Sequence, residues 1–251
     1  MKAPKYIFWT IYNIWFYILV LVFTLIIILP TFVLMQSSGA PYKFFYGAGV
    51  LWSDMILFCM GMFPKKNKAL KTTKHKPYIF VANHVSMIDV MLFISTIRTN
   101  PIIFIGKKEL DKIPLFGYIY KRTMILVDRS SNESKKKVFA ETKKKLNSGI
   151  SIALFPEGTV PDVDVELASF KHGAFTMAIE HQVPIVPLSF LDNKKRFPWS
   201  FGGLIGFSKG FPGILRVNTH KPIETNGMVK EDRVELNEKV REIILKDLRI
   251  T

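Results

Sequence analysis

The chain opens with a long apolar segment. From Tyr6 to Tyr42 there is no charged residue and no histidine. Within it, the run Ile7–Leu29 would extend roughly 34 Å as a helix at about 1.5 Å per residue, enough to cross a hydrocarbon core about 30 Å thick. The apolar core of a cleaved signal peptide is only about 7–15 residues long. The pattern therefore predicts a helix that stays in the membrane. Pro30 should end or kink it, with the following QSSGAP as a loop.

A second apolar segment covers residues 43–62 but is interrupted by Ser53-Asp54. A carboxylate is costly at bilayer depth, so we expect this segment to lie in the membrane interface or to pack on protein. Lysines flank the two segments on their outer sides, at Lys2, Lys5, Lys65, Lys66 and Lys68. This asymmetry predicts a hairpin with both ends on the cytoplasmic face of the cell (inner) membrane; a single span is the weaker alternative. We therefore divide the chain into a membrane-anchoring helical segment, residues 1–64, and a main domain, residues 65–251.

In the main domain, short apolar runs alternate with longer amphipathic ones. The expected strands are Tyr78–Ala82, Ile102–Ile105, Ile125–Val127, Ser151–Phe155, Ile185–Phe190 and Leu215–Thr219. The expected helices are Met87–Ile97, Asn132–Leu146, Gly173–His181 and Lys230–Leu248. Unbroken apolar strands separated by helices predict an α/β fold, with a mainly parallel sheet flanked by helices and the N-terminal membrane-embedded helical hairpin attached to it.

The first four of these strands all end in polar or charged residues. The four exits are Asn83-His84, Gly106-Lys107-Lys108, Asp128-Arg129 and Pro156-Glu157-Gly158-Thr159. Because the carboxyl ends of parallel strands meet at one edge of a sheet, and ligands bind at that edge, four such exits predict a functional site there.

His84 and Asp89, in IFVANHVSMIDV, admit two interpretations. Ser86 to Asp89 has the form of a capping box, so the carboxylate could simply close the start of a helix. Alternatively, His84 is a general base whose tautomer Asp89 fixes, since neutral imidazole accepts a proton near pH 7. The two roles are compatible, because a carboxylate has two oxygens.

The sequence contains no obvious protein nucleophile for His84 to activate. There is no G-x-S-x-G elbow, and Ser86 is better explained as a helix cap. This favours direct attack by a substrate hydroxyl, without a covalent enzyme intermediate. The five histidines show no paired ligand spacing, so no metal or other cofactor is expected; they are His75, His84, His172, His181 and His220.

Charge narrows the choice of partner. The formal net charge of +15 lies almost entirely outside the first 64 residues, which suits a protein held against an anionic surface. No zinc-knuckle, helix-turn-helix or RNP-like pattern is present, so nucleic acid is not an expected partner. The lysine triplets 135–137 and 143–145 on one predicted helix are either a solvated face or a contact for lipid headgroups.

Taken together and in order, the motifs resemble those of the glycerolipid acyltransferase superfamily, most closely the bacterial 1-acyl-glycerol-3-phosphate acyltransferases. The matching blocks are NHVSMID (83–89), GKKEL (106–110), MILVDRS (124–130), LFPEGT (154–159), SFKHGAF (169–175) and VPIVPL (183–188). The resemblance implies transfer of a fatty acyl group from an acyl-thioester, on coenzyme A or acyl carrier protein, to a lysophospholipid hydroxyl. It also implies that a helical hairpin docks the enzyme on membrane phospholipids.

The resemblance implies roles for particular residues. His84 is then the base and Asp89 orients it. The implied substrate-binding residues are Asn83, Lys108, Arg129, Phe155, Pro156, Glu157, Gly158, Thr159 and Lys171. An intact His84–Asp89 pair argues against the remaining class of function, a lipid-binding scaffold on an acyltransferase fold.

The chain departs from the family pattern at two positions. Val160 stands where the family has an arginine that binds the acceptor phosphate, and Thr123 stands where the second block opens with glycine. Arg129, Lys171 or the basic run 194–196 could replace the lost contact. Otherwise the acceptor is another lysolipid, such as a lyso-aminolipid.

Overall fold

The computed structural model describes residues 3–38, 42–67, 72–73, 76–113, 116–128, 130–162, 164–199 and 208–250. Arg129, one of the predicted site residues, lies outside the described residues, as do Lys68 and His75.

Seven strands of the described chain form one sheet. They are β1 (Met62–Lys66), β2 (Ile79–Ala82), β3 (Ile102–Lys107), β4 (Ile125–Val127), β5 (Ser151–Leu154), β6 (Ile185–Phe190) and β7 (Gly213–Thr219). Their order is β1-β7-β6-β2-β5-β3-β4. The five strands from β6 to β4 run parallel, whereas β7 pairs antiparallel with β6 and parallel with β1. The predicted mainly parallel sheet is confirmed.

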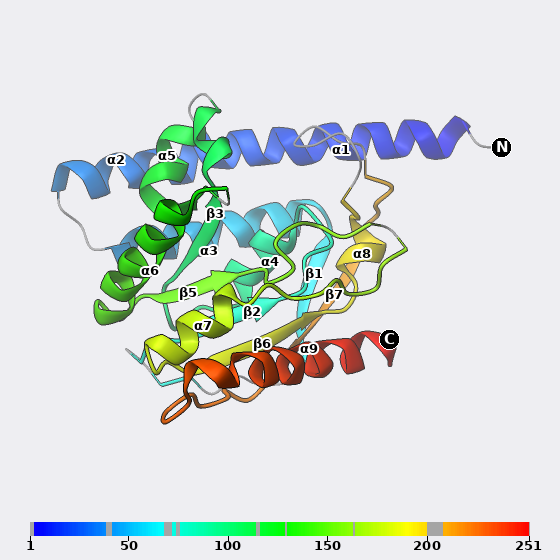
Figure 1. Ribbon diagram of the computed structural model, residues 1–251. Helices are drawn as coiled ribbons and strands as arrows, with labels where there is room; N and C mark the ends of the chain where they lie inside the picture. Colours follow the sequence, from blue (N-terminus) through cyan, green and yellow to red (C-terminus); the bar gives the residue numbers. More distant parts are fainter. Residues whose placement is uncertain are drawn as a thin grey trace.

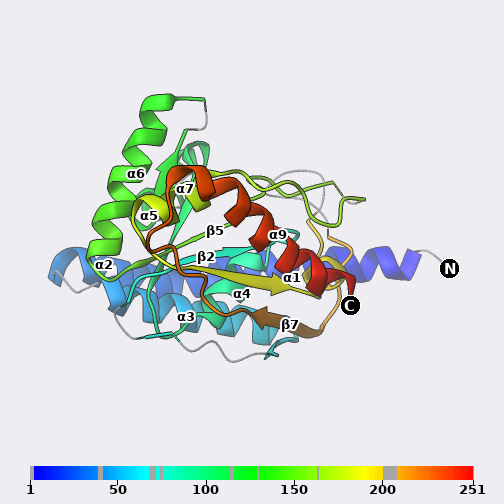
Figure 2. The same cartoon turned by 60° about the horizontal axis from the view of Figure 1, so that its bottom comes forward.

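Helices cover both faces of the sheet, as the apolar strands require. In β2, Phe80 and Ala82 face one hydrophobic cluster while Ile79 and Val81 face another. The first cluster contains side chains of α1 (Ala3–Phe23), α3 (Tyr42–Cys59) and α4 (Asp89–Thr96). The second contains side chains of α6 (Asn132–Asn147), α7 (Gly173–Glu180) and α9 (Arg233–Arg249). Figures 1 and 2 show these two sets on opposite sides of the sheet.

Among the described strands and α-helices, three are not anticipated by the sequence pattern: β1, α5 (Phe116–Thr123) and α8 (Asn193–Arg196). The strand β1 reads MFPKK and lies at the sheet edge, where proline and lysine are tolerated. The two helices are only eight and four residues long, too short for a clear helical period. The strand β1 also runs across the predicted boundary after residue 64, and the division into two units stays a prediction.

The first helix does not end at Pro30, where the sequence predicts an end or a kink, and the first residues of the loop expected from Gln36 onward are helical. The helix α1 passes into a π-helical turn, Thr24–Ile28, and continues as α2 (Leu29–Ser38), so that Gln36–Ser38 are helical rather than loop. A proline clashes with the carbonyl four residues before it. The π turn, in which the Leu29 N–H donates to the Thr24 carbonyl five residues back, directly precedes Pro30 and re-spaces these carbonyls. The chain therefore stays helical through Pro30.

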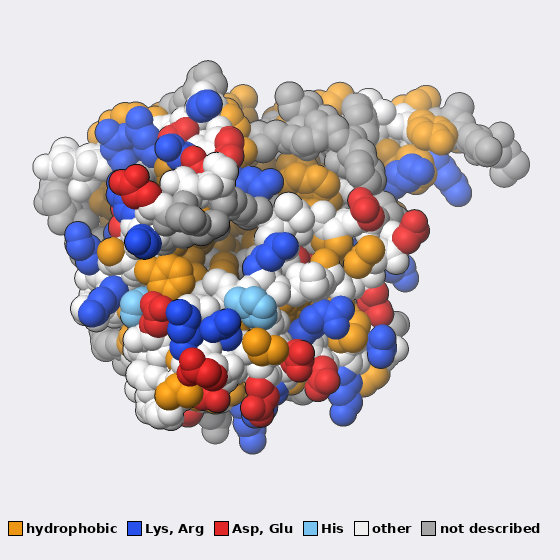
Figure 3. All heavy atoms as spheres, viewed as in Figure 1, with side chains coloured by type: hydrophobic (Ala, Val, Ile, Leu, Met, Phe, Trp, Pro, Cys, Tyr) orange, Lys and Arg blue, Asp and Glu red, His pale blue; other side chains and the backbone are white. Residues whose placement is uncertain are grey.

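This N-terminal helix lies along the body of the protein. Tyr12, Phe16, Leu19 and Phe32 are buried. The opposite side is exposed and apolar, and includes Ile7, Ile11, Ile18, Leu25, Ile26 and Leu34; part of it is visible as hydrophobic side chains along α1 in Figure 3. Within the described chain, the span Pro4–Ser37 is the one helix long and apolar enough to cross a membrane, by length and composition.

Polar groups fix α1 on the body. Asn13 is buried, and its amide donates to the Ser208 carbonyl (2.8 Å) and accepts from the Ser208 N–H (2.8 Å). The Tyr12 hydroxyl donates to the Met60 carbonyl (2.7 Å). The same amide also donates to the Trp9 carbonyl within α1 (2.6 Å), so an asparagine inside an apolar helix is paired both within that helix and with a segment 195 residues away.

The second apolar segment, α3, packs on the protein. Asp54 accepts two hydrogen bonds from Arg98 (2.8 and 2.9 Å) and one from the Ser95 hydroxyl (2.6 Å), both in or next to α4. The carboxylate that interrupts this segment therefore has partners on the neighbouring helix.

Candidate active site

His84 and Asp89 meet at the carboxyl end of β2. The strand ends at Ala82, the chain turns, and α4 begins at Asp89. This turn brings His84 Nδ1 within 2.8 Å of Asp89 Oδ2. Asp89 is fully buried, whereas the side chain of His84 remains 18% exposed. The geometry leaves His84 Nε2 as the ring nitrogen directed away from the carboxylate.

Asp89 both holds the turn that precedes α4 and contacts the imidazole. Its Oδ2 also accepts the Val85 N–H (2.6 Å) and the Ser86 N–H (2.8 Å). The Ser86 contact is the carboxylate half of a capping box, and the Ser86 hydroxyl accepts from the Ile88 N–H (3.2 Å). The helix itself begins two residues later than expected, because Met87 and Ile88 form a turn.

This arrangement fixes the tautomer of His84. A backbone N–H can only donate, so the Asp89 carboxylate acts as an acceptor towards its neighbours. His84 Nδ1 therefore carries the hydrogen, and Nε2 carries the lone pair that can accept a proton from a substrate.

Two aromatic rings enclose the imidazole. Phe155, a predicted site residue, stacks on His84 with ring centroids 4.1 Å apart and planes 14° apart. Trp199 meets the same ring edge-on at 5.8 Å. These rings limit the imidazole to one orientation. Sequence reasoning missed Trp199, which lies 115 positions after His84 and in no motif.

Glu157 braces the loop that carries His84. It is 3% exposed. Its Oε1 accepts the His84 N–H (2.7 Å) and its Oε2 accepts the Ala168 N–H (2.9 Å), so each oxygen has a backbone partner. Burial raises the pKa of Glu157, although these N–H groups and His84 partly oppose the shift.

This pKa shift predicts the pH dependence of stability for Glu157→Gln. A carboxyl whose native pKa is raised binds protons more readily when folded, so its contribution to stability falls as pH rises through the unfolded value of 4.5 towards the native pKa. Glutamine cannot ionise. Thermal unfolding from pH 4 to 8 should therefore show the melting temperature of Glu157→Gln rising relative to native protein as pH increases. The exposed Glu180→Gln is the control, and a difference that shrinks with rising pH would contradict the interpretation.

The remaining predicted residues at the β2 and β5 exits are held by backbone contacts. The Asn83 amide, 1% exposed, donates to the Phe190 carbonyl (3.0 Å) and accepts from its N–H (2.8 Å). The Pro156 carbonyl accepts the Lys171 N–H (2.7 Å). Gly158 closes the turn at a positive φ of 79°, which favours glycine, and Thr159 next to it is exposed.

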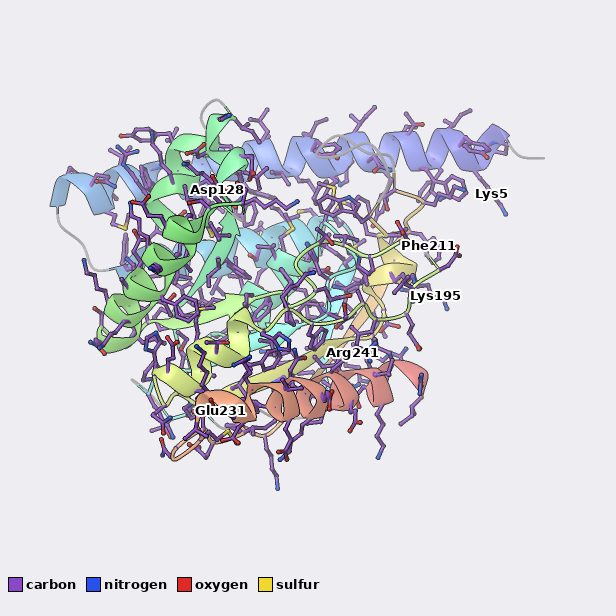
Figure 4. The ribbon with its side chains drawn as sticks, in the orientation of Figure 1. Lys5, Asp128, Lys195, Phe211, Glu231 and Arg241 are labelled. Atoms are coloured by element: carbon purple, nitrogen blue, oxygen red, sulfur yellow. The ribbon has the colours of Figure 1, made fainter. Side chains whose placement is uncertain are left out.

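The basic exits lie on the far strands of the sheet. Lys107 and Lys108 are exposed at the end of β3. After β4, the Ser130 hydroxyl and N–H lower the pKa of Asp128, and the charge of Lys108 adds to this effect. Figure 4 shows Asp128 near α5 and α6, across the molecule from Lys195 in α8. The proposed role of Arg129, the neighbour of Asp128, stays a prediction.

Two of the basic residues considered as replacements for an arginine at position 160 have other partners. Lys194 Nζ donates to the Val165 carbonyl (3.0 Å), and Arg196 donates to the Pro212 carbonyl (3.0 Å). Lys171 and Lys195 are exposed. No group of three histidine, cysteine, aspartate or glutamate residues that could hold a metal occurs in the described part of the chain.

Comparison with known proteins identifies the class. The model of the family described as Acyltransferase matches residues 65–191. A 1-acyl-sn-glycerol-3-phosphate acyltransferase of Escherichia coli is 31% identical over 188 residues, which is 73% of each chain. The chain therefore belongs to the acyltransferase family, and the resemblance read from its motifs is confirmed.

Two further relatives bear on the extent of the match. A chloroplastic 1-acyl-sn-glycerol-3-phosphate acyltransferase of Arabidopsis thaliana is 28% identical over 186 residues, 73% of this chain and 50% of that one. The chain spans about half the length of several curated relatives that it matches. The crystal structure of the 1-acyl-sn-glycerophosphate acyltransferase from Thermotoga maritima superposes with a TM-score of 0.77 at 24% identity, over 98% of this chain and 96% of that one. This superposition confirms the fold.

Proposed function

We propose that the protein transfers a fatty acyl group from an acyl-thioester to the sn-2 hydroxyl of 1-acyl-glycerol-3-phosphate and so forms phosphatidic acid. The observation that carries this proposal is the His84 Nδ1–Asp89 Oδ2 contact of 2.8 Å at the carboxyl end of β2. The names of the Escherichia coli and Arabidopsis thaliana relatives support the same acceptor.

The reaction needs only a base and a bound hydroxyl. His84 Nε2 takes the proton of the acceptor hydroxyl as its oxygen attacks the thioester carbonyl. The tetrahedral intermediate collapses, the new ester C–O bond remains, and the C–S bond breaks. The thiolate takes the proton back from the imidazolium, whose charge the buried Asp89 stabilises in the meantime. Either acyl-CoA or acyl carrier protein would supply the thioester, and no other cofactor enters this scheme.

The N-terminal helix would place this reaction at a lipid surface. One side of α1 and α2 is buried on the body along most of its length, while the other side exposes Ile11, Ile18 and Ile26. A helix fixed in this way enters the lipid as part of the body and lies in the interface plane. We propose that it rests on the cytoplasmic face of the inner membrane.

A specific observation favours a second acceptor class. Val160 replaces an arginine, and Lys194 and Arg196 already donate to backbone carbonyls. The same loop carries the exposed acidic side chains Asp162 and Asp164. Together these residues would suit a lysolipid with an amine in its headgroup, such as a lyso-aminolipid.

A panel of lysolipids separates the two acceptors. With one acyl-CoA in excess, we expect 1-acyl-glycerol-3-phosphate to react at least about tenfold faster than a lyso-aminolipid, and acyl carrier protein should be tested as donor in parallel. Val160→Arg adds a bidentate phosphate contact and should raise kcat/KM for the phosphate acceptor by roughly tenfold or more. Val160→Leu is the matched control. A strong preference for the phosphate-free acceptor would replace the proposed substrate.

A further inference from the structure

We propose that Asn193 is a positioning residue for the catalytic pair, holding Asp89 in the orientation that serves His84. The proposal rests on the proposed function of His84 as a base. Asn193 is the first residue of α8 and lies outside every motif that the sequence analysis identified.

The contact is short and fully buried. Asn193 Nδ2 donates to Asp89 Oδ1 at 2.6 Å, and both side chains are inaccessible to solvent. The orientation of the amide is defined, because rotating it would place its oxygen against a carboxylate oxygen. Asn193 Oδ1 has no hydrogen-bond partner among the described residues. Leaving a buried acceptor unpaired costs free energy, so the site keeps this amide for the bond that it donates.

Asn193 completes the hydrogen bonding of Asp89. The other oxygen, Oδ2, receives His84, Val85 and Ser86, while the one described contact to Oδ1 comes from Asn193. With both oxygens engaged, the carboxylate cannot rotate about its Cβ–Cγ bond. Without the amide, only the bonds to Oδ2 hold the carboxylate, which can then pivot about that oxygen and change the plane in which Oδ2 meets Nδ1.

The helix α8 is itself rigidly attached. Asp192, just before it, forms a bidentate ion pair with Arg216 (2.7 and 2.8 Å). Just after it, the Phe197 carbonyl accepts the Ser86 hydroxyl, and the Trp199 N–H donates to the Val85 carbonyl (2.9 Å). The segment around α8 is therefore anchored to β7 just before Asn193 and to the catalytic loop just after α8.

The charged surroundings matter for any titration at this position. Asp89 and His84 face Asn193 from the catalytic loop, and Glu157 interacts electrostatically with both. The segment that carries Asn193 also contains Asp192, Lys194 and Arg196, and Asp192 forms an ion pair with Arg216.

Two substitutions test the role in activity. Asn193→Leu keeps the approximate volume and removes the donor. We expect kcat to fall on the order of 10–100-fold, the usual cost of removing a group that orients a functional imidazole through a hydrogen-bonded partner. The KM values for both substrates should be nearly unchanged. Asn193→Asp should retain more activity at acid pH, where the introduced carboxyl is protonated and donates to Asp89. Its activity relative to native should fall as pH rises, because two adjacent carboxylates repel.

The matched control is Asn100→Leu. Asn100 is 1% exposed and donates to the carbonyls of Thr73 (3.2 Å) and Lys76 (2.9 Å). Its loss should lower the melting temperature but leave kcat within about threefold of native, since these carbonyls belong to the segment before β2. If Asn193→Leu fails to fold, the pH-dependent activity ratio of Asn193→Asp still tests the proposal.

A spectroscopic readout is independent of the acceptor. Nitrogen NMR of the histidine rings in detergent, with His84→Gln to assign the signal, reports which ring nitrogen carries the hydrogen. We expect the Nδ1–H form of His84 in native protein and in Asn100→Leu, and a mixture of tautomers in Asn193→Leu. A native tautomer together with kcat within about twofold in Asn193→Leu would overturn the proposal. If native protein acylates no lysolipid, the proposed function fails, but the tautomer still decides on Asn193.

Discussion

Replacing His84 with alanine is expected to lower kcat by about 10³- to 10⁴-fold while the protein stays folded. The fall corresponds to roughly 4–5.5 kcal/mol of transition-state stabilisation. No other described group can take the place of Nε2, because Asp89 is buried behind the imidazole and both oxygens of Glu157 hold backbone N–H groups. Turnover with saturating donor and acceptor is the measurement.

His181→Ala is the control for this experiment. His181 caps the end of α7, next to the amino-terminal end of β6 and therefore away from the catalytic edge of the sheet. Its variant should keep kcat within about twofold of native. Near-normal turnover in His84→Ala, with the melting temperature unchanged, would show that another group is the base.

Phe197→Ala is expected to have the largest effect on stability. The ring is fully buried and lies against Phe16 at 5.0 Å and Tyr12 at 5.9 Å, both on α1. Removing such a ring costs about 3–5 kcal/mol, because the cavity left between two packed elements collapses only partly. For a chain of this length the melting temperature should fall by roughly 6–20 °C, as measured by circular dichroism in detergent.

Activity should fall with stability in this variant. The Phe197 carbonyl accepts the Ser86 hydroxyl, so movement of this segment reaches the loop that carries His84. Phe211→Ala is the control, since that ring is 39% exposed and should shift the melting temperature by about 2 °C or less. A comparable loss in both variants would mean that the packing of Phe197 on α1 has no special role.

The local sequence pattern was sufficient to predict the bounds of elements whose apolar residues face the core at regular intervals. The strands β4 and β6 have the expected bounds, and α6 begins at Asn132 with Ser131 as its N-cap, whose hydroxyl accepts from the Ser134 N–H (3.1 Å). The contact between His84 and Asp89 could also be anticipated, because five residues across one turn leave few alternatives. Such features depend on neighbours in sequence.

The surroundings of that contact could not be read from the sequence in the same way. Asn193 lies 104 positions after Asp89, and nothing in the run DNKKRF indicates which side chain turns inward. The substrate-binding role that the resemblance implies for Glu157 stays a prediction, whereas its contacts with the backbone of His84 and Ala168 had no signal in the sequence. The sequence likewise identifies α1 as apolar, but it does not show that one side of this helix packs on the body of the protein. Tertiary packing decides each of these cases.

The pairing of Asn13 with Ser208 has a consequence for biosynthesis. The helix α1 is the first described element to leave the ribosome, but the partner of its buried amide is made 195 residues later. At about 5–20 residues per second this delay is roughly 10–40 s. During that time the Asn13 side chain has only the Trp9 carbonyl of its own helix as a partner, and an amide left partly unpaired in an apolar phase is costly. The nascent helix is therefore expected to wait at the membrane surface, with Asn13 towards water, and to join the body only when the last third of the chain has been synthesised.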